Sequence, residues 1–226
     1  MAARSFVAAR ATTSGTAPLS ATARLVGAVA IPGSKSLSNR ALVCAALSTG
    51  ESVLRGLASG DDTTRMVVGL RALGADIEES PGDARDVVIR RGVALADASE
   101  CSVHTGLAGT TSRFLTALAA LRVGRTTIDG DAGLRRRPMG DVIRLIRTLG
   151  ANVEELGEPN CLPLAVSRGA LRLQYDSPTR QTLVAQGGVS SQFVSAMMMI
   201  APRLGGLVVT LPRDMVSREY LHMTAG

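Results

Sequence analysis

The chain has 226 residues, 46% of them hydrophobic, so it is long and apolar enough to bury a core in one or two domains. Aromatic residues make up only 2% and tryptophan is absent, which disfavours single-stranded nucleic-acid binding, because bases need aromatic platforms to stack on. A net charge of +6 is compatible with nucleic acid, an acidic membrane surface or small anionic substrates, and three cysteines without metal-ligand spacing indicate a reducing compartment and no zinc site.

The N-terminal segment, residues 1–24, is rich in Ala, Ser, Thr and Arg and contains no acidic residue. This composition overlaps with that of organellar transit peptides, but a disordered N-terminal extension is the interpretation we favour. The segment lacks the apolar core of a signal peptide, and no apolar run in the chain reaches the roughly 18 residues of a membrane span. We therefore expect a cytoplasmic protein without membrane or nucleic-acid partners, with organellar import as the alternative.

A Pro-Gly turn follows, and it holds the only lysine of the chain, Lys35, among 25 basic residues. Ser36 and Arg40 come next at the start of an expected helix, and the first acidic residue is Glu51. Because a helix start carries unpaired N–H groups and partial positive charge, this segment is predicted to bind an anion. A solvated turn lysine is the alternative. A Walker A loop is excluded, because Ser34 stands where that loop requires glycine.

Three segments of the chain repeat one pattern. In each, small hydroxyl residues begin a helix that is apolar on nearly every face, a glycine turn follows, and a strand comes next. Such helices are predicted to be buried, because no face of them suits water. The copies begin at residues 38, 111 and 190, so they are spaced by 73 and then 79 residues.

A second helix follows in each copy. Apolar residues at helical spacing precede Gly74 and Gly150, so these two helices are predicted to be amphipathic and to end in a glycine cap. Short strands are expected after them at residues 87–90 and 162–167. The third copy of this helix begins near residues 217–221, and the chain ends before its glycine.

The fold class predicted from this pattern is α/β, with repeated βαβαββ units, buried helices and outer sheets. About two and a half of three such repeats are present. Because the third repeat is unfinished, we expect a fragment, a truncated reading frame or one half of a split protein.

The repeated helix starts, packed around a common axis, would aim their N–H groups at one region and form a shared anion site. An arginine triplet before the second amphipathic helix adds cations suited to bidentate contacts. The alternatives are helix caps, ordinary turns and solvent-facing arginines, and the acidic pair Asp61 and Asp62 is interpreted as capping the next helix. The candidate residues are Lys35, Ser36, Arg40, Gly109, Thr110, Thr111, Arg113, Arg135, Arg136, Arg137, Ser190, Ser191 and Gln192.

At four of these places the chain resembles the EPSP synthase (3-phosphoshikimate 1-carboxyvinyltransferase) family, from about residue 25 to its end. Four motifs in order are specific, although each alone is weak. The related UDP-N-acetylglucosamine enolpyruvyl transferase shares the repeated fold but lacks the first motif. The motifs are Pro32-Gly33-Ser34-Lys35-Ser36 with Asn39-Arg40, Ala108-Gly109-Thr110 with Arg113, Arg137-Pro138-Met139-Gly140, and Val189-Ser190-Ser191-Gln192-Phe193.

The resemblance implies an enolpyruvyl transferase of the shikimate pathway, which leads to chorismate and the aromatic amino acids. Such an enzyme moves the enolpyruvyl group of phosphoenolpyruvate to the 5-hydroxyl of shikimate 3-phosphate by addition and elimination, without a metal or organic cofactor. The residues implied for shikimate 3-phosphate are Lys35, Ser36, Arg40, Ser190, Ser191, Gln192 and Ser217. Those implied for phosphoenolpyruvate are Lys35, Gly109, Arg137 and Gln192, with Thr110, Arg113 and Tyr220 as further candidates.

The chain departs from the family pattern in three respects. Leu107 stands where the family usually has asparagine, and Glu219 where it commonly has proline. The family also continues into a second lobe that supplies the catalytic base and further cations. The resemblance therefore implies that residues 25–226 form the shikimate-3-phosphate-binding lobe, inactive without a complementary C-terminal half. A non-catalytic binding module for a small phosphate ester is the alternative.

Overall fold

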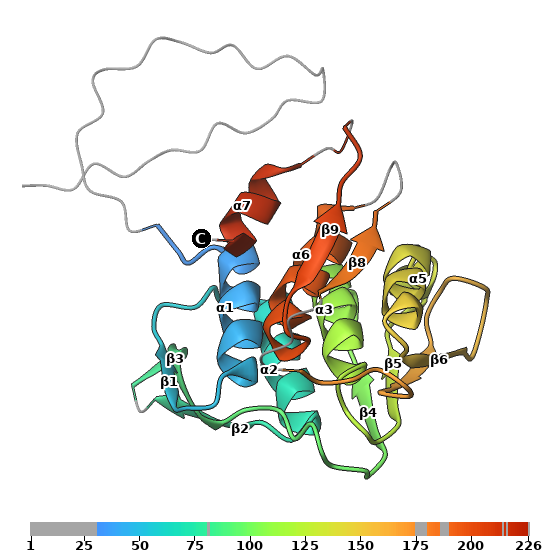
Figure 1. The fold of residues 1–226 in the computed structure, drawn as a ribbon. Coiled ribbons are helices and arrows are strands. Elements are labelled where there is room, and N and C mark those ends of the chain that lie inside the picture. The colour runs from blue at the N-terminus through green and yellow to red at the C-terminus, as the bar shows by residue number, and fades with distance from the viewer. Residues whose placement is uncertain are drawn as a thin grey trace, which may run out of the picture. The chain divides into compact units, whose positions relative to one another are not determined.

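The computed structural model describes residues 31–80, 82–174, 180–185, 190–213, 215 and 217–225 (Figure 1). The chain divides after Ile31, and the description below concerns residues from Pro32 onward. The extension predicted over residues 1–24 lies outside the described residues. No described helix is long and apolar enough to cross a membrane.

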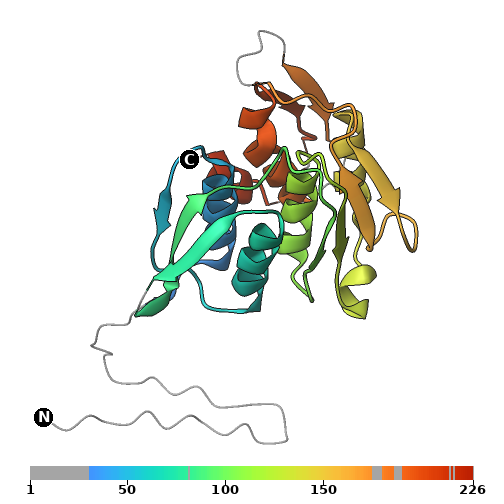
Figure 2. The ribbon, with the colours of Figure 1, turned by 90° about the horizontal axis from the view of Figure 1, so that it is seen from below.

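The centre of the fold is formed by three helices that pack against one another (Figures 1 and 2). In the helix Gly109–Ala119 nine of eleven residues are buried, and the side chains of Phe114 and Leu115 are fully inaccessible to solvent. The burial predicted from their apolar sequences is therefore confirmed. The three helices are α1 (Lys35–Leu47), α3 (Gly109–Ala119) and α6 (Ser191–Ile200).

The two amphipathic helices end in the same hydrogen-bonded cap. At the end of the helix before Gly74, the amide of Gly74 donates to the carbonyl of Arg71 (2.9 Å), and the amide of Ala75 donates to the carbonyl of Leu70 (3.0 Å). The same two bonds recur around Gly150, and both glycines have positive φ, 93° and 98°. This arrangement is a Schellman motif, so the predicted glycine caps are confirmed. The helices are α2 (Asp61–Ala72) and α5 (Gly140–Thr148).

In the described part of the chain, three sheets cover the helices (Figure 2). The first has the order β1-β3-β2, the second β4-β5-β7-β6, and the third pairs β8 with β9. The strands are β1 (Ser52–Leu54), β2 (Asp76–Ser80), β3 (Asp83–Arg91), β4 (Cys101–His104), β5 (Thr126–Asp129), β6 (Asn152–Glu155), β7 (Leu164–Ser167), β8 (Gln181–Val184) and β9 (Leu207–Thr210). Short helices α4 (Ala132–Arg135), η1 (Ala201–Arg203) and α7 (Glu219–Ala225) complete the fold.

Strand pairing repeats along the chain as the helices do. The antiparallel set β5-β7-β6 matches β1-β3-β2, and the parallel pair β4-β5 matches β8-β9. The second repeat shows the whole predicted unit, β4-α3-β5-α5-β6-β7, with α4 inserted before α5.

Several boundaries differ from those predicted. The strand expected at residues 87–90 is the longer β3, Asp83–Arg91, and α3 begins at Gly109, two residues before the start of the repeated pattern. The first helix begins at Lys35, one residue before Ser36 and three before the repeated pattern starts at residue 38, because the Ser34 hydroxyl caps it by accepting from the amide of Leu37 (3.4 Å). The strand expected from residue 162 begins at Leu164, since Pro163 has no N–H to donate to a sheet.

Candidate functional site

The first turns of α1, α3 and α6 open onto one cavity of about 320 Å³. The predicted convergence of three helix starts is therefore present. Its lining is polar and, among the residues that the structure describes, contains no carboxylate. The residues that line it are Lys35, Ser36, Arg40, Thr110, Ser190, Ser191, Gln192, Ser217 and Tyr220.

Local sequence explains how α6 presents its residues. Ser190 has extended backbone dihedrals, and its hydroxyl accepts from the amide of Gln192 (3.4 Å), as an N-cap does. Helix capping, the alternative to ligand binding at Ser190, is therefore confirmed, and the same residue also lines the cavity. Capping and ligand contact are compatible, because a hydroxyl has one donor and two acceptor positions.

Ser217 reaches the cavity from the turn before α7. Its φ is 60°, in the left-handed region that non-glycine residues rarely occupy. Glu219, at the position where the resemblance expects proline, is the first residue of α7. Tyr220 follows it and lines the cavity with a half-exposed ring.

Lys35 forms an ion pair that the sequence analysis missed. Its Nζ lies 3.5 Å from Oδ1 of Asp62, the second residue of α2. The backbone carbonyl of Asp62 also accepts a hydrogen bond from the Thr111 hydroxyl (3.0 Å), which ties the start of α2 to α3. The sequence predicts a capping role for Asp61 and Asp62. Only the packing of α2 beside α1 shows that Asp62 also pairs with Lys35.

Arg40 lines the cavity and is 4% exposed. Four of its hydrogen bonds end on protein oxygens of Ser36, Ser195, Tyr220 and Thr224. A guanidinium has five N–H groups, so little of its donor capacity remains for a ligand. Burial lowers its pKa, while Tyr220 and Cys44 oppose the shift. Arg40 therefore contributes positive charge to the cavity and also fastens α7 to the central helices.

Arg113 contacts the cavity indirectly. Its Nη1 donates to the side-chain oxygen of Gln192, and its guanidinium carbon lies 4.7 Å from the centre of the Phe193 ring. Burial and, to a lesser degree, the positive charge of Arg137 lower the pKa of Arg113. Two arginines are thus held near each other beside the cavity, which favours an anion between them.

Gly109 and Arg137 meet next to the cavity. A Cβ on Gly109 would lie 3.1 Å from Nη1 of Arg137, so the absence of a side chain lets the guanidinium approach the start of α3. Arg135 is instead paired with Asp129 (Nε to Oδ1, 2.9 Å), and Arg136 is exposed. Of the arginine triplet, the residue before proline is therefore the one beside the site.

Leu107, where the resemblance expects asparagine, is 53% exposed on the turn before α3. Among the described residues, no group of three His, Cys, Asp or Glu side chains is placed to hold a metal ion. The site therefore offers cations, hydroxyls, an amide and helix ends, which together suit a small, multiply charged anion.

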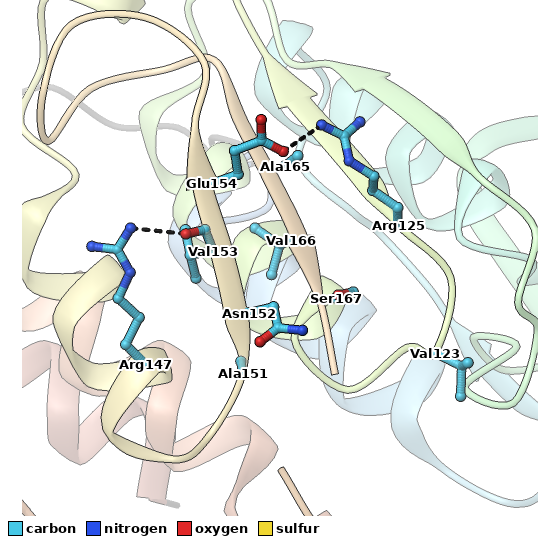
Figure 3. Close-up of a pocket in the computed structure, with 10 residues that line it drawn as sticks. All are labelled: Val123, Arg125, Arg147, Ala151, Asn152, Val153, Glu154, Ala165, Val166 and Ser167. Atoms are coloured by element: carbon cyan, nitrogen blue, oxygen red, sulfur yellow. Dashed lines mark hydrogen bonds and ion pairs between the residues drawn. The ribbon is translucent and has the colours of Figure 1, made fainter. Parts of the chain in front are cut away.

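A second hollow, of about 440 Å³, lies beside β6 and β7 (Figure 3). Its two arginines already have protein partners: Arg125 pairs with Glu154 (2.8 Å), and Arg147 donates to the carbonyl of Val153 (2.8 Å). Because the carboxylate of Glu154 is part of its lining, this hollow is less suited to an anionic ligand than the cavity at the helix starts, whose described lining has no acidic residue.

Comparison with known proteins adds a family. The model of the EPSP synthase (3-phosphoshikimate 1-carboxyvinyltransferase) family matches residues 19–226. A 3-phosphoshikimate 1-carboxyvinyltransferase of Bordetella petrii is 37% identical over 203 residues, which cover 88% of this chain and 43% of the relative. One from Rhizobium leguminosarum bv. trifolii is 42% identical over 177 residues, covering 78% and 40%.

A solved structure agrees with these relatives. EPSP synthase from Acinetobacter baumannii superposes with a TM-score of 0.69 at 26% identity, covering 84% of this chain and 41% of that one. The chain thus spans less than half the length of the proteins it matches. With four motifs, a repeated α/β fold and a family match over nearly its whole length, the chain belongs to the EPSP synthase family.

Proposed function

We propose that residues 25–226 form the shikimate-3-phosphate-binding lobe of a carboxyvinyl transferase. The observation that carries this proposal is the cavity where three helix N-termini meet Lys35 and Arg40 in a chain of this family. Shikimate 3-phosphate carries a phosphate and a carboxylate, and both are stabilised by fixed cations and free backbone N–H groups.

The proposed ligand contacts follow the lining of the cavity. Shikimate 3-phosphate would be held by Lys35, Ser36, Arg40, Ser190, Ser191, Gln192 and Ser217. Phosphoenolpyruvate would lie where Arg137 approaches Gly109, beside the cavity that Lys35 and Gln192 line. Thr110 and Tyr220 stay candidates, since both line the cavity.

The proposed reaction is transfer of the enolpyruvyl group of phosphoenolpyruvate to the 5-hydroxyl of shikimate 3-phosphate. The hydroxyl adds to the enol carbon, the enol methylene carbon gains a proton, and elimination then releases phosphate and returns a proton. This chain supplies binding and positive charge for these steps, but the described cavity lining contains no carboxylate that could act as base. We therefore propose that turnover requires a complementary C-terminal part, with the cytoplasm as the site of action.

The test is complementation. The purified chain, a separately produced C-terminal part of a bacterial relative, and their mixture are each given both substrates, and phosphate release is measured. Phosphate release that occurs in the mixture but with neither part by itself supports the proposal. Loss of that release when the chain carries Lys35→Ala shows that the reaction depends on this cavity. Substantial turnover by the chain alone, or none by the mixture under conditions where shikimate 3-phosphate binds, contradicts it.

The second candidate function is a non-catalytic binding module for a small phosphate ester. The described part of the cavity lining favours it, because it holds cations and hydroxyls but no carboxylate, and such a site can bind an anion without transferring protons. It predicts ligand-dependent stabilisation of the chain and no rescue of phosphate release by any complementary part.

A further inference from the structure

The side chain of Gln192 has two different neighbours. It lines the cavity with Lys35 and Ser36, and its amide oxygen accepts a hydrogen bond from Nη1 of Arg113. Gln192 belongs to the first turn of α6 and Arg113 to the second turn of α3, so this bond crosses the contact between the two helices.

The chemistry of the two groups fixes which end of the amide faces which neighbour. A guanidinium has only donors, so the amide group of Gln192 must turn its oxygen toward Arg113. The NH₂ end, with its two donors, is then the part of the amide left to face the cavity. An amide without this partner could present its oxygen instead, and an oxygen repels an anionic ligand.

Arg113 is held firmly enough to impose this orientation. Its guanidinium stacks over Phe193, a residue that is 3% exposed, and its Nε is buried without a partner among the described residues. A partly buried cation is usually satisfied best by a carboxylate. Here it meets a neutral amide, and a carboxylate at position 192 would place a negative charge in the wall of an anion site.

We propose that Arg113 is a positioning residue: it holds the Gln192 amide with its NH₂ group toward the cavity, where that group donates to a phosphate or carboxylate oxygen of the ligand. This inference rests on the proposed function for the identity of the ligand. It gives Arg113 an indirect role in place of the direct substrate contact that the resemblance left open.

The first test needs no ligand. In the 226-residue chain labelled with nitrogen-15, the NH₂ signals of Gln192 are assigned by their absence in Gln192→Ala. They are then compared with those in Arg113→Met, which keeps a long apolar stem over Phe193 but has no donor. We expect the Gln192 signals to shift and their hydrogen exchange to accelerate in Arg113→Met, and to be partly restored in Arg113→Lys. Unchanged signals in Arg113→Met overturn the proposal.

The second test measures affinity for shikimate 3-phosphate by calorimetry, with inorganic phosphate as a second probe. Arg113→Met and Gln192→Ala are each expected to weaken binding about tenfold, and the double variant no more than either alone, because both remove one oriented donor. Additive losses would mean that Arg113 contacts the ligand independently, which overturns the positioning role. If the unmodified chain binds no shikimate 3-phosphate, the proposed function fails, and the ligand-free comparison still decides the orientation.

A charge substitution separates this role from a structural one. Gln192→Glu should raise the melting temperature, because a carboxylate pairs with Arg113, and at the same time weaken phosphate binding more than tenfold. Gln181→Glu, on β8 and outside the cavity lining, is the matched control and should leave affinity unchanged. A stabilised Gln192→Glu variant that binds as tightly as the unmodified chain contradicts the proposal.

Discussion

Replacing Lys35 by alanine should separate stability from ligand binding. The Nζ of Lys35 is 3.5 Å from Asp62, but the lysine side chain is 57% exposed. Exposed ion pairs contribute about 0–1 kcal/mol to the free energy of unfolding. Since about 1 kcal/mol corresponds to roughly 2–4 °C for a domain of this size, Lys35→Ala should lower the melting temperature by no more than that.

The effect on binding should be larger. At a shikimate 3-phosphate concentration of 100 times the Kd, binding stabilises the native state by about 2.7 kcal/mol, or roughly 5–11 °C. A charged hydrogen bond contributes about 1.5–3 kcal/mol, so its loss weakens affinity roughly tenfold or more. At the same concentration, the ligand would then stabilise Lys35→Ala by no more than about 1.4 kcal/mol.

The assay is thermal unfolding with and without shikimate 3-phosphate. Arg125→Ala is the matched control, because Arg125 is an exposed cation paired with Glu154 outside the cavity, and it should keep the full ligand shift. Asp62→Asn should tighten binding, because the carboxylate no longer competes for Lys35. A full ligand shift in Lys35→Ala would refute the role of Lys35, and loss of its cooperative transition would show that Lys35 is needed for the fold.

Three further outcomes follow from the geometry. Gly109→Ala should leave the melting temperature nearly unchanged, because the new methyl group would be tight only against the movable end of Arg137 (3.1 Å) and in ordinary contact with Leu134 (3.8 Å). Calorimetry should nevertheless show weaker phosphoenolpyruvate binding in the complemented protein. Gly124→Ala should lower the urea midpoint by more than Gly50→Ala, since its methyl would overlap a backbone carbonyl while that of Gly50 meets nothing within 4 Å. Hydrogen bonds from Arg85 lower the pKa of Asp83 from 3.8 to about 2. The contribution of Asp83 to the free energy of unfolding should therefore be complete above pH 3.8 and be lost as the pH falls through 2. A carboxyl titration by NMR with its midpoint near 3.8 would contradict this.

Local sequence determined the repeated architecture and the helix ends. Glycines at the same place in two repeats predicted the two caps, because a Schellman motif involves only residues within one turn of the glycine. The motif around Lys35 and the hydroxyls at Ser190 likewise predicted helix starts, since capping depends on neighbours two or three residues away. Recurrence of these signals then indicated a common site.

Only the tertiary structure decided which side chains meet across helices. Asp62 pairs with Lys35, and Gln192 with Arg113, over separations of 27 and 79 residues, and no periodicity in the chain encodes either contact. The four hydrogen bonds from Arg40 to protein oxygens could not be predicted either, because three of those oxygens belong to α6 and α7. Sequence thus determined which groups carry charge. The packing of α1, α2, α3 and α6 decided how much of each charge stays available to a ligand, because a protein partner such as Asp62 competes with the ligand for the same cation.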